Sequence, residues 1–359
     1  MKLMMTLAFL ALSILPQASA GKPAGSPVTR DGYKVLAPIS HGNLTIFPIV
    51  TSAWHETGNL ITLDEGLRSG EVVVTEAGGV RGLMRGRRAR PVPESGPEVN
   101  RLVLLNNSSH PLLLLAGEIV TGGKQDRVVG KDRIVLPHSD PLDLSVFCVE
   151  PGRWTETKAA FGGYSAQMAQ PSVRKRAMAD KDQQKVWAEV GRARGEMAGA
   201  MASPSARNEV SETSSYAKAM QTAEVAESVD RVAQPMITSY GGVIHQLRQQ
   251  NAVGVVVAVR GEIIWADIFA STSLLEKYWP KLARSYAAES ITNSHAGNGA
   301  GITLARDFLD NHTGGREVVE SEPGVFRSTE VTGAGFHLFE LTALLPGTGF
   351  DVHISKMAD

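Results

Sequence analysis

Two short segments of this 359-residue chain are crowded with side chains that can do chemistry, although apolar runs surround them. The first extends from Gly117 to Val129 and the second from Cys148 to Trp154. Burying a polar group without a partner costs roughly 1 to 3 kcal/mol. These groups must therefore satisfy one another or bind a ligand. The residues predicted to bind a ligand are Gly122, Gly123, Lys124, Gln125, Arg127, Arg153 and Trp154.

The double glycine of the first segment is typical of a tight turn. Such a turn can direct backbone N–H groups at an anion, and Lys124 and Arg127 would add positive charge around it. One interpretation is therefore a site for an anionic small molecule such as a phosphate. The other is a hairpin turn in which Lys124 points into water while Asp126 and Arg127 pair with neighbours. The spacing is not that of a P-loop, which needs Gly-x4-Gly-Lys-Ser/Thr before a helix.

Three carboxylates, Glu118, Asp126 and Glu150, are the candidates for acid and base catalysis. Glu118 and Glu150 each end an apolar run, where partial burial suits a carboxyl group to proton transfer. A pair of them meeting across a sheet would suit hydrolysis. The alternative is a structural salt bridge from Glu118 to Arg127 or Arg153.

The single cysteine and the histidines give no second catalytic set. Cys148 alternates with Val146 in an apolar run, which predicts a buried and inert thiol. The nine histidines show no i, i+2 or i, i+4 pair, so no zinc signature is present. No dinucleotide fingerprint or nucleophile elbow stands out either. We therefore predict neither a metal nor a cofactor.

The run from Leu112 to Arg127, followed by Cys-Val-Glu-Pro-Gly-Arg-Trp at 148–154, resembles the ARG-and-rhodanese-phosphatase-superfamily-associated protein family. The resemblance covers Asn43 to about Phe161 and the region from Tyr240 to Phe269. It implies a genomic context of ADP-ribose chemistry and no established activity. It therefore points to a context and not to a mechanism.

The N-terminus predicts export. Lys2 precedes an apolar run from Met4 to Leu15, and small residues lead to Ala20, which is the pattern of a signal peptide cleaved after residue 20. The predicted location is periplasmic or extracellular, with a bacterial envelope preferred. One cysteine excludes an intramolecular disulfide, and no later segment predicts a membrane span. A net charge of -1 gives no general attraction to nucleic acid, so no nucleic-acid partner is expected.

The pattern along the chain predicts an α+β protein. A leader at 21–40 precedes a β-rich domain at 41–165, whose closely spaced strands favour antiparallel pairing. Residues 166–236 are rich in Ala, Lys, Glu and Met and predict a segment that is either helical or partly disordered. Residues 237–359 predict an α+β part that either stands alone or completes the same core.

Several helices are predicted by apolar spacing and capping residues. They cover Thr62 to Leu67, Val243 to Gln250, a stretch beginning at Ser273, and Thr303 to Leu309. Asp182 to Met201 and Ser214 to Ala233 also approach helical spacing, but a partly disordered connection is the alternative there. Ser273 is chosen as a helix start because Glu276 would complete a capping box.

The sequence leaves three functions open. The leading hypothesis is a non-catalytic binding or accessory protein with an anionic ligand, because no complete catalytic set can be found. The second is a hydrolase of ADP-ribose-like or other glycosidic substrates that uses the clustered carboxylates. The third is an envelope scaffold that contacts protein partners through the helical segment around Trp187.

Overall fold

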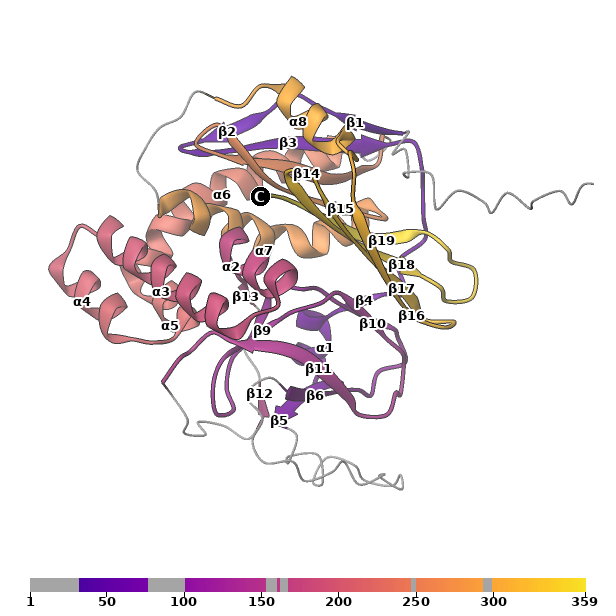
Figure 1. Cartoon of the computed structure of the whole chain (residues 1–359), viewed down its shortest axis with the longest axis horizontal. Coiled ribbons are helices and arrows are strands. Elements are labelled where there is room, and N and C mark those ends of the chain that lie inside the picture. The colour runs from indigo at the N-terminus through magenta and orange to yellow at the C-terminus, as the bar shows by residue number, and fades with distance from the viewer. Residues whose placement is uncertain (1–31, 77–100, 153–159, 162–166, 247–249, 293–298) are drawn as a thin grey trace, which may run out of the picture. The chain divides into compact units, whose positions relative to one another are not determined.

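The computed structural model describes residues 32–76, 101–152, 160–161, 167–246, 250–292 and 299–359 (Figure 1). The predicted signal peptide, residues 21–31 of the leader at 21–40, and both Arg153 and Trp154 lie outside these residues. The elements are an alternation of antiparallel strands and helices, which confirms the predicted α+β class.

The largest described sheet has nine strands and combines both ends of the described chain (Figure 1). Every strand pair in it is antiparallel. The early strand β3 pairs with β14, so the predicted β-rich region shares a sheet with the C-terminal part. Across the sheet lie β1 (Tyr33–Val35), β3 (Leu44–Thr51), β14 (Ala252–Val259), β15 (Glu262–Phe269), β19 (Asp351–Ala358), β18 (Phe336–Ala343), β17 (Phe326–Gly333) and β16 (Arg316–Glu322), with β2 (Ile39–His41) beside β3.

The other strands form two smaller sheets from residues between Ile61 and Met168. Their pairs are antiparallel except for the parallel pair of β4 and β7. One sheet contains β10 (Arg133–Val135), β7 (Leu112–Leu114) and β4 (Ile61–Thr62). The other contains β12 (Ala160–Phe161), β5 (Val72–Glu76), β6 (Arg101–Asn106), β11 (Leu142–Cys148), β9 (Arg127–Val129), β8 (Glu118–Val120) and β13 (Gln167–Met168).

The middle of the chain is helical, which decides between the two predictions for residues 166–236. Its apolar side chains pack into one buried cluster with Ile119 and Val128 of the seven-stranded sheet. The helices there are α2 (Pro171–Lys175), a π-helix (Arg176–Asp180), α3 (Gln183–Ala200), α4 (Pro204–Glu212), α5 (Tyr216–Gln221) and α6 (Ala223–Gln246). The remaining helices are α1 (Leu63–Ser69), α7 (Thr272–Ile291) and α8 (Ile302–Asp310).

Two predicted helix starts are wrong. Helix α7 begins after Ser271, whose side chain accepts a hydrogen bond from Leu274 N, and not at Ser273. Helix α6 runs through Gly241 and Gly242 and does not begin at Val243. It continues because Tyr240 and Ile244, four residues apart on one face, are both buried against the largest core cluster. Burial of this face outweighs the low helix propensity of two glycines.

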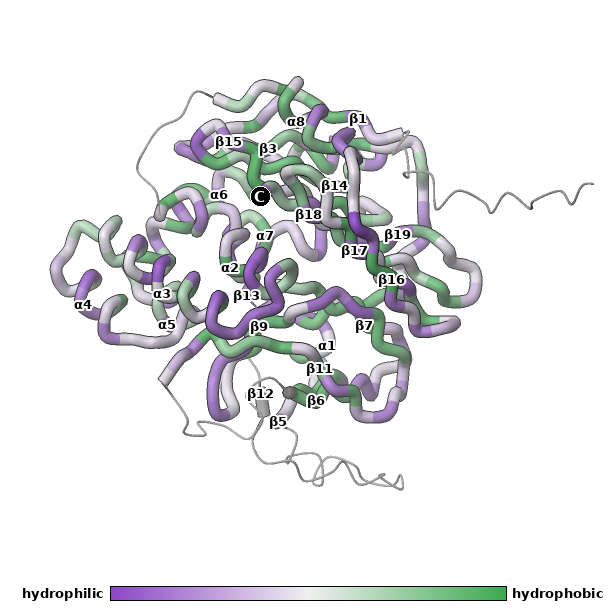
Figure 2. The backbone as a smooth tube through the Cα atoms, in the orientation of Figure 1, coloured by the Kyte–Doolittle hydropathy of each residue, from purple (hydrophilic) through white to green (hydrophobic). Residues whose placement is uncertain are grey.

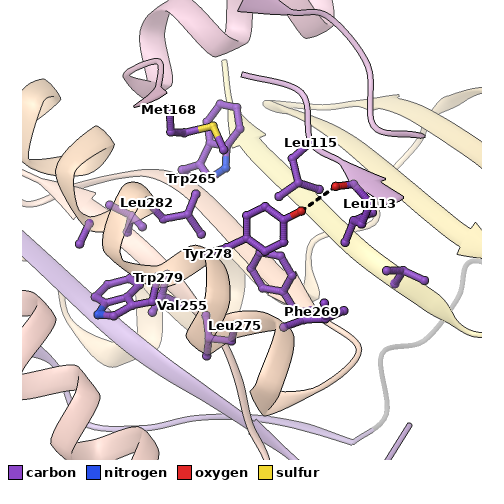
Figure 3. Packing of buried hydrophobic residues seen from close by; sticks show 14 of the residues in the cluster. Leu113, Leu115, Met168, Val255, Trp265, Phe269, Leu275, Tyr278, Trp279 and Leu282 are labelled. Carbon is purple, nitrogen blue, oxygen red and sulfur yellow. Dashed lines mark hydrogen bonds between the residues drawn. The ribbon is translucent and has the colours of Figure 1, made fainter. Parts of the chain in front are cut away.

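Helices cover both faces of the nine-stranded sheet, so the interior strand β14 is buried and apolar along its whole length (Figure 2). On β14, Val255 and Val257 join the cluster with α6 and α7, whereas Val256 and Ala258 face the cluster with α8. Figure 3 shows the first of these clusters, where the Tyr278 hydroxyl donates to Leu113 O at 2.8 Å. Helix α7 is thereby fixed between the nine-stranded and the three-stranded sheets.

Gly254 on β14 gives a direct test of this packing. A Cβ atom there would lie 2.8 Å from Ile268 Cα and would also meet Asp267 O, both on the backbone of β15. We predict that Gly254→Ala lowers the free energy of unfolding in urea by about 1 to 3 kcal/mol. Gly241→Ala is the control, because nothing lies near its Cβ position and alanine favours helix. That variant should gain about 0.5 to 1 kcal/mol, and equal effects of the two variants would contradict the packing described here.

Candidate functional site

The Gly122-Gly123 turn holds carboxylates of the protein itself. Both glycines have positive φ, of 125° and 52°, which explains their use at this turn. The N–H of Gly122 donates to Asp126 Oδ1 at 3.1 Å, and the N–H of Lys124 donates to Glu76 Oε1 at 3.0 Å. The N–H groups of Gly122 and Lys124 therefore point at carboxylates. The acceptors that the structure describes at these N–H groups are side chains of the protein itself.

The neighbouring predicted residues belong to the same internal network. The N–H of Asp126 donates to Glu150 Oε2 at 3.1 Å, and Gln125 Nε2 donates to the backbone oxygen of Glu150 at 3.2 Å. Asp126 Oδ2 accepts from Ser215 Oγ of the helical region at 2.7 Å. Arg127 is 1% exposed, with Nη2 3.9 Å from Glu76 Oε1. The structure therefore brings Gly122 to Arg127 together with Glu150.

Cys148 is buried beside this network. Its sulfur accepts from the N–H of Glu150 at 3.3 Å, and burial raises the pKa of the thiol. A raised pKa disfavours the thiolate, which is the nucleophilic form. The prediction of a buried thiol is confirmed.

Glu118 forms a buried ion pair, but not with Arg127, and the other predicted partner, Arg153, lies outside the described residues. The structure pairs its Oε1 with Lys281 Nζ of α7, while Oε2 accepts from the N–H of Leu115 at 2.8 Å. Lys281 also donates to Asp64 Oδ2 at 2.8 Å. The predicted pairing of Glu118 with Arg127 is therefore wrong, because β8 turns this side chain toward α7.

The charges of this ion pair depend on burial and on the second carboxylate. Burial raises the pKa of Glu118, and Lys281 only partly offsets this effect. Burial alone would lower the pKa of Lys281, but Glu118 and Asp64 together raise it. Lys281 therefore stays cationic between two carboxyl groups, and Glu118 is the group whose proton affinity is increased.

A second buried ionic network contacts the two residues that precede Glu118 in the chain. Arg174 donates to both oxygens of Asp267, with distances of 2.9 Å and 3.1 Å, and both side chains are fully buried. His353 lies between two carboxylates, with Nδ1 2.6 Å from Asp132 Oδ2 and Nε2 3.2 Å from Asp267 Oδ1. The hydroxyls of Ser355 and Tyr286 also donate to Asp267.

This network determines the backbone path into Glu118. Asp132 Oδ1 accepts from the N–H of Ala116 at 2.7 Å. Gly117 has φ of 95°, and a Cβ there would lie 2.6 Å from Arg174 Cγ. Glycine is required at this position by both its conformation and the arginine against it. The strand that carries Glu118 is thus held in place by Asp132 and Arg174.

Two titratable groups of this network, Asp267 and His353, have shifted pKa values. Burial alone would raise the pKa of Asp267, but Arg174 and His353 hold it well below its ordinary value. Burial alone would lower the pKa of His353, but Asp132 and Asp267 raise it to about 9. Both groups are therefore charged at neutral pH, and the Asp267 carboxylate lies between the cations of Arg174 and His353.

Lys281 also lines a pocket with a volume of about 570 Å³. Helices α1 and α7 and strand β13 provide most of its wall. Four lining side chains are basic and two are acidic. The basic residues are Arg68, Lys277, Lys281 and Arg284, and the acidic residues are Asp64 and Glu65.

Sequence reasoning missed the basic wall of this pocket and the buried network. Lys277, Lys281 and Arg284 lie at positions i, i+4 and i+7 of α7, a spacing that places them on one helix face. That signal was present in the sequence. Asp267 within the apolar strand β15 was also visible, but nothing local indicates that Arg174 is its partner.

The residues that the structure describes contain neither a membrane-spanning helix nor a cluster of metal ligands. No helix there combines the length and apolar character that a membrane crossing requires. No group of three or more His, Cys, Asp or Glu side chains there is placed to hold a metal ion.

The fold and site define an α+β protein in which a buried ionic network supports a polar pocket beside one long helix. The sequence profile of the ARG and Rhodanese-Phosphatase-superfamily-associated Protein domain matches residues 32–356. The chain therefore belongs to this family, and the match extends well beyond the segments that carry the resemblance. Searches among curated proteins and among solved structures found no match.

The first prediction from the site concerns Lys281. Lys281→Met should lower the free energy of unfolding by roughly 3 to 5 kcal/mol, because it leaves buried Glu118 without its cation. Lys277→Met is the matched control, since its pair with Glu65 is partly exposed and should contribute at most about 1 kcal/mol.

Adding Glu118→Gln to Lys281→Met should recover part of the loss, because no uncompensated carboxylate then remains. Urea unfolding of the single and double variants measures this coupling. Strictly additive losses would show that the two side chains do not act as a pair.

The second prediction concerns pH and His353. Its folded pKa of about 9 lies above the ordinary value of 6.5, so protonation stabilises the folded state. This contribution is complete below pH 6.5 and is lost as pH rises through about 9. The urea midpoint of the wild type should therefore fall over this range, and the fall should be much smaller in His353→Gln. An identical pH profile for both proteins would exclude His353 as its cause.

Proposed function

We propose that this protein binds a small anionic molecule in the pocket between α1 and α7. The observation that carries the proposal is the excess of four basic over two acidic side chains in the pocket wall. A volume of about 570 Å³ suits a small ligand, since ligand pockets span about 300 to 1,000 Å³.

The basic side chains differ in how firmly the protein holds them. Arg68 is exposed and makes no ion pair with any described residue. Lys277 and Arg284 pair with Glu65 and Asp230, and all four of these side chains are about one-third exposed. Exposed pairs of this kind contribute little, about 0 to 1 kcal/mol, so a ligand can replace the carboxylates. Arg68, Lys277 and Arg284 are therefore the proposed anion-binding groups.

Lys281 has a different role in this proposal. It is 9% exposed and lies between Asp64 and Glu118, so its charge is already balanced. Lys281 therefore forms the floor of the site and contributes less to the attraction of an anion. The segment from Gly122 to Arg127 is the other predicted anion site. Carboxylates of the protein accept hydrogen bonds from its N–H groups, and its role as a ligand site stays a prediction.

Binding has more support than catalysis because of where Glu118 lies. Its side chain is fully buried and Lys281 stands between it and the pocket. A ligand in the pocket would reach Glu118 only if Lys281 moved. The remaining candidate bases, Asp126 and Glu150, accept hydrogen bonds from Ser215 and from the backbone of the turn.

One observation favours the hydrolase as a second candidate. Burial raises the pKa of Glu118, as a general acid requires, and Asp64 places a second carboxylate in the pocket wall. The family resemblance implies a context of ADP-ribose chemistry, so ADP-ribose is a suitable ligand for testing both candidates. Export and a scaffold role remain hypotheses, and the apolar faces of α3 to α6 contribute to the protein's own core.

The test measures binding of inorganic pyrophosphate and ADP-ribose by calorimetry and thermal unfolding. A ligand at a hundred times its dissociation constant should stabilise the protein by about 2.7 kcal/mol. Arg68→Ala, Lys277→Ala and Arg284→Ala should each weaken binding by about tenfold, since each removes one charge-assisted contact.

Lys124→Ala is the matched control in this experiment, because it removes one positive charge from the other predicted site. Loss of binding in Lys124→Ala alone would place the anion at the Gly122 turn. Failure of both anions to bind folded wild type would contradict the proposal. Products formed from bound ADP-ribose, and lost in Glu118→Gln, would instead support the hydrolase.

A further inference from the structure

A second pocket lies at the other end of the contact between α7 and the nine-stranded sheet. It has a volume of about 380 Å³ and shares no lining residue with the pocket of the basic side chains. The loop after β3, the residue before β14 and the first turn of α7 form its wall. The residues that matter here are Trp54, His55, Glu56, Asn251 and Glu276.

Trp54 is exposed on a loop that is firmly held. Its side chain is 67% exposed, more than any other large apolar side chain in the described residues. The next residue, His55, stacks on Phe350 with 4.2 Å between ring centroids. On the other side, Asn251 Nδ2 donates to the backbone oxygen of Ala53 at 2.9 Å. An indole ring is thus presented to water at the rim of a pocket by neighbours that are fixed.

The floor of the pocket is a set of linked hydroxyl groups. Thr57 Oγ1 lies 2.5 Å from Ser271 Oγ and 3.3 Å from Ser273 Oγ. Ser271 Oγ and Ser273 Oγ are 2.9 Å apart. Thr57 and Ser271 are at least nine-tenths buried, so this arrangement is part of the folded structure. Each hydroxyl can donate or accept a hydrogen bond, which suits it to a ligand hydroxyl.

The negative charge of this pocket wall excludes the anionic ligands proposed for the first pocket. Glu56 and Glu276 line it, and neither lysine nor arginine does. An anion would be repelled. Carboxylates, an amide and hydroxyls provide many hydrogen-bond acceptors and few strong cationic donors. The matching ligand is therefore neutral, rich in hydroxyl donors, and able to cover an aromatic face.

We propose that this pocket binds a neutral saccharide whose sugar ring stacks on Trp54. A pyranose ring has an apolar C–H face, which complements the negative face of an indole. Its hydroxyl groups point outward around the ring, where Glu56, Asn251 and Glu276 offer acceptors. The volume suits one or two sugar units, since it lies near the lower end of the range for ligand pockets, about 300 to 1,000 Å³. This site is independent of the proposed anion site.

The experiment titrates folded protein with methyl β-D-glucopyranoside, N-acetyl-D-glucosamine, cellobiose and maltose at millimolar concentrations, using calorimetry and saturation-transfer NMR. At least one sugar should bind, and Trp54→Ala should weaken it by at least about tenfold, whereas Trp54→Phe should retain part of the affinity. Leu304→Ala is the matched control, because it removes another exposed apolar side chain on α8, 54% exposed, away from this pocket.

Charge-neutral variants separate a saccharide from an organic cation. Glu56→Gln and Glu276→Gln keep an oxygen acceptor, so sugar binding should survive in both, with little dependence on salt. Tetramethylammonium serves as the alternative probe, since a cation can also bind over a tryptophan face. The proposal is overturned if none of the four sugars binds, if Trp54→Ala leaves sugar binding unchanged, or if only tetramethylammonium binds.

Discussion

The fork between Arg174 and Asp267 is the interaction on which the rest of the structure depends. Asp267 belongs to a central strand of the nine-stranded sheet, and Arg174 comes from the helical region. His353 extends the fork to Asp132 in the loop after β9. Four charged groups from four separate parts of the chain thus meet in the interior. Because removing one partner of a buried pair leaves an uncompensated charge, these parts cannot move independently at low cost.

The position of the polar pocket follows from this network. Asp132 and Arg174 hold Ala116 and Gly117, and Glu118 comes next in the chain. Glu118 then sets Lys281 at the bottom of the pocket beside α7. The buried charged groups Asp132, Arg174 and Glu118 therefore position the proposed anion-binding residues on α7 without contacting the ligand themselves. A buried network of this kind is weak evidence for stability, but it can specify one arrangement among several.

How well the sequence predicted each interaction depends on how far apart the two partners lie along the chain. Strands and most helices were predictable, because apolar spacing and capping residues are local signals; Thr62 with Glu65 at α1 is an example. The Gly122 turn was predictable as a polar cluster, since Asp126 and Glu150 lie in the two polar segments of the sequence. Its contacts with Glu76 and Ser215, which come from more distant parts of the chain, were not. The partner of Glu118 was not, because Lys281 is separated from it by 163 positions. Such pairings depend on topology, which local patterns do not encode.

The pairing of β3 with β14 has a consequence for how the chain acquires its fold. Val50 meets Ala252, a partner that the ribosome adds roughly 200 residues later. During synthesis, β3 therefore has only β1 and β2 as sheet partners for most of the time that the chain is growing. Contacts this distant in sequence slow folding, because loop closure must precede them. An N-terminal fragment ending before β14 would leave unpaired the edge of β3 that faces β14, which favours aggregation.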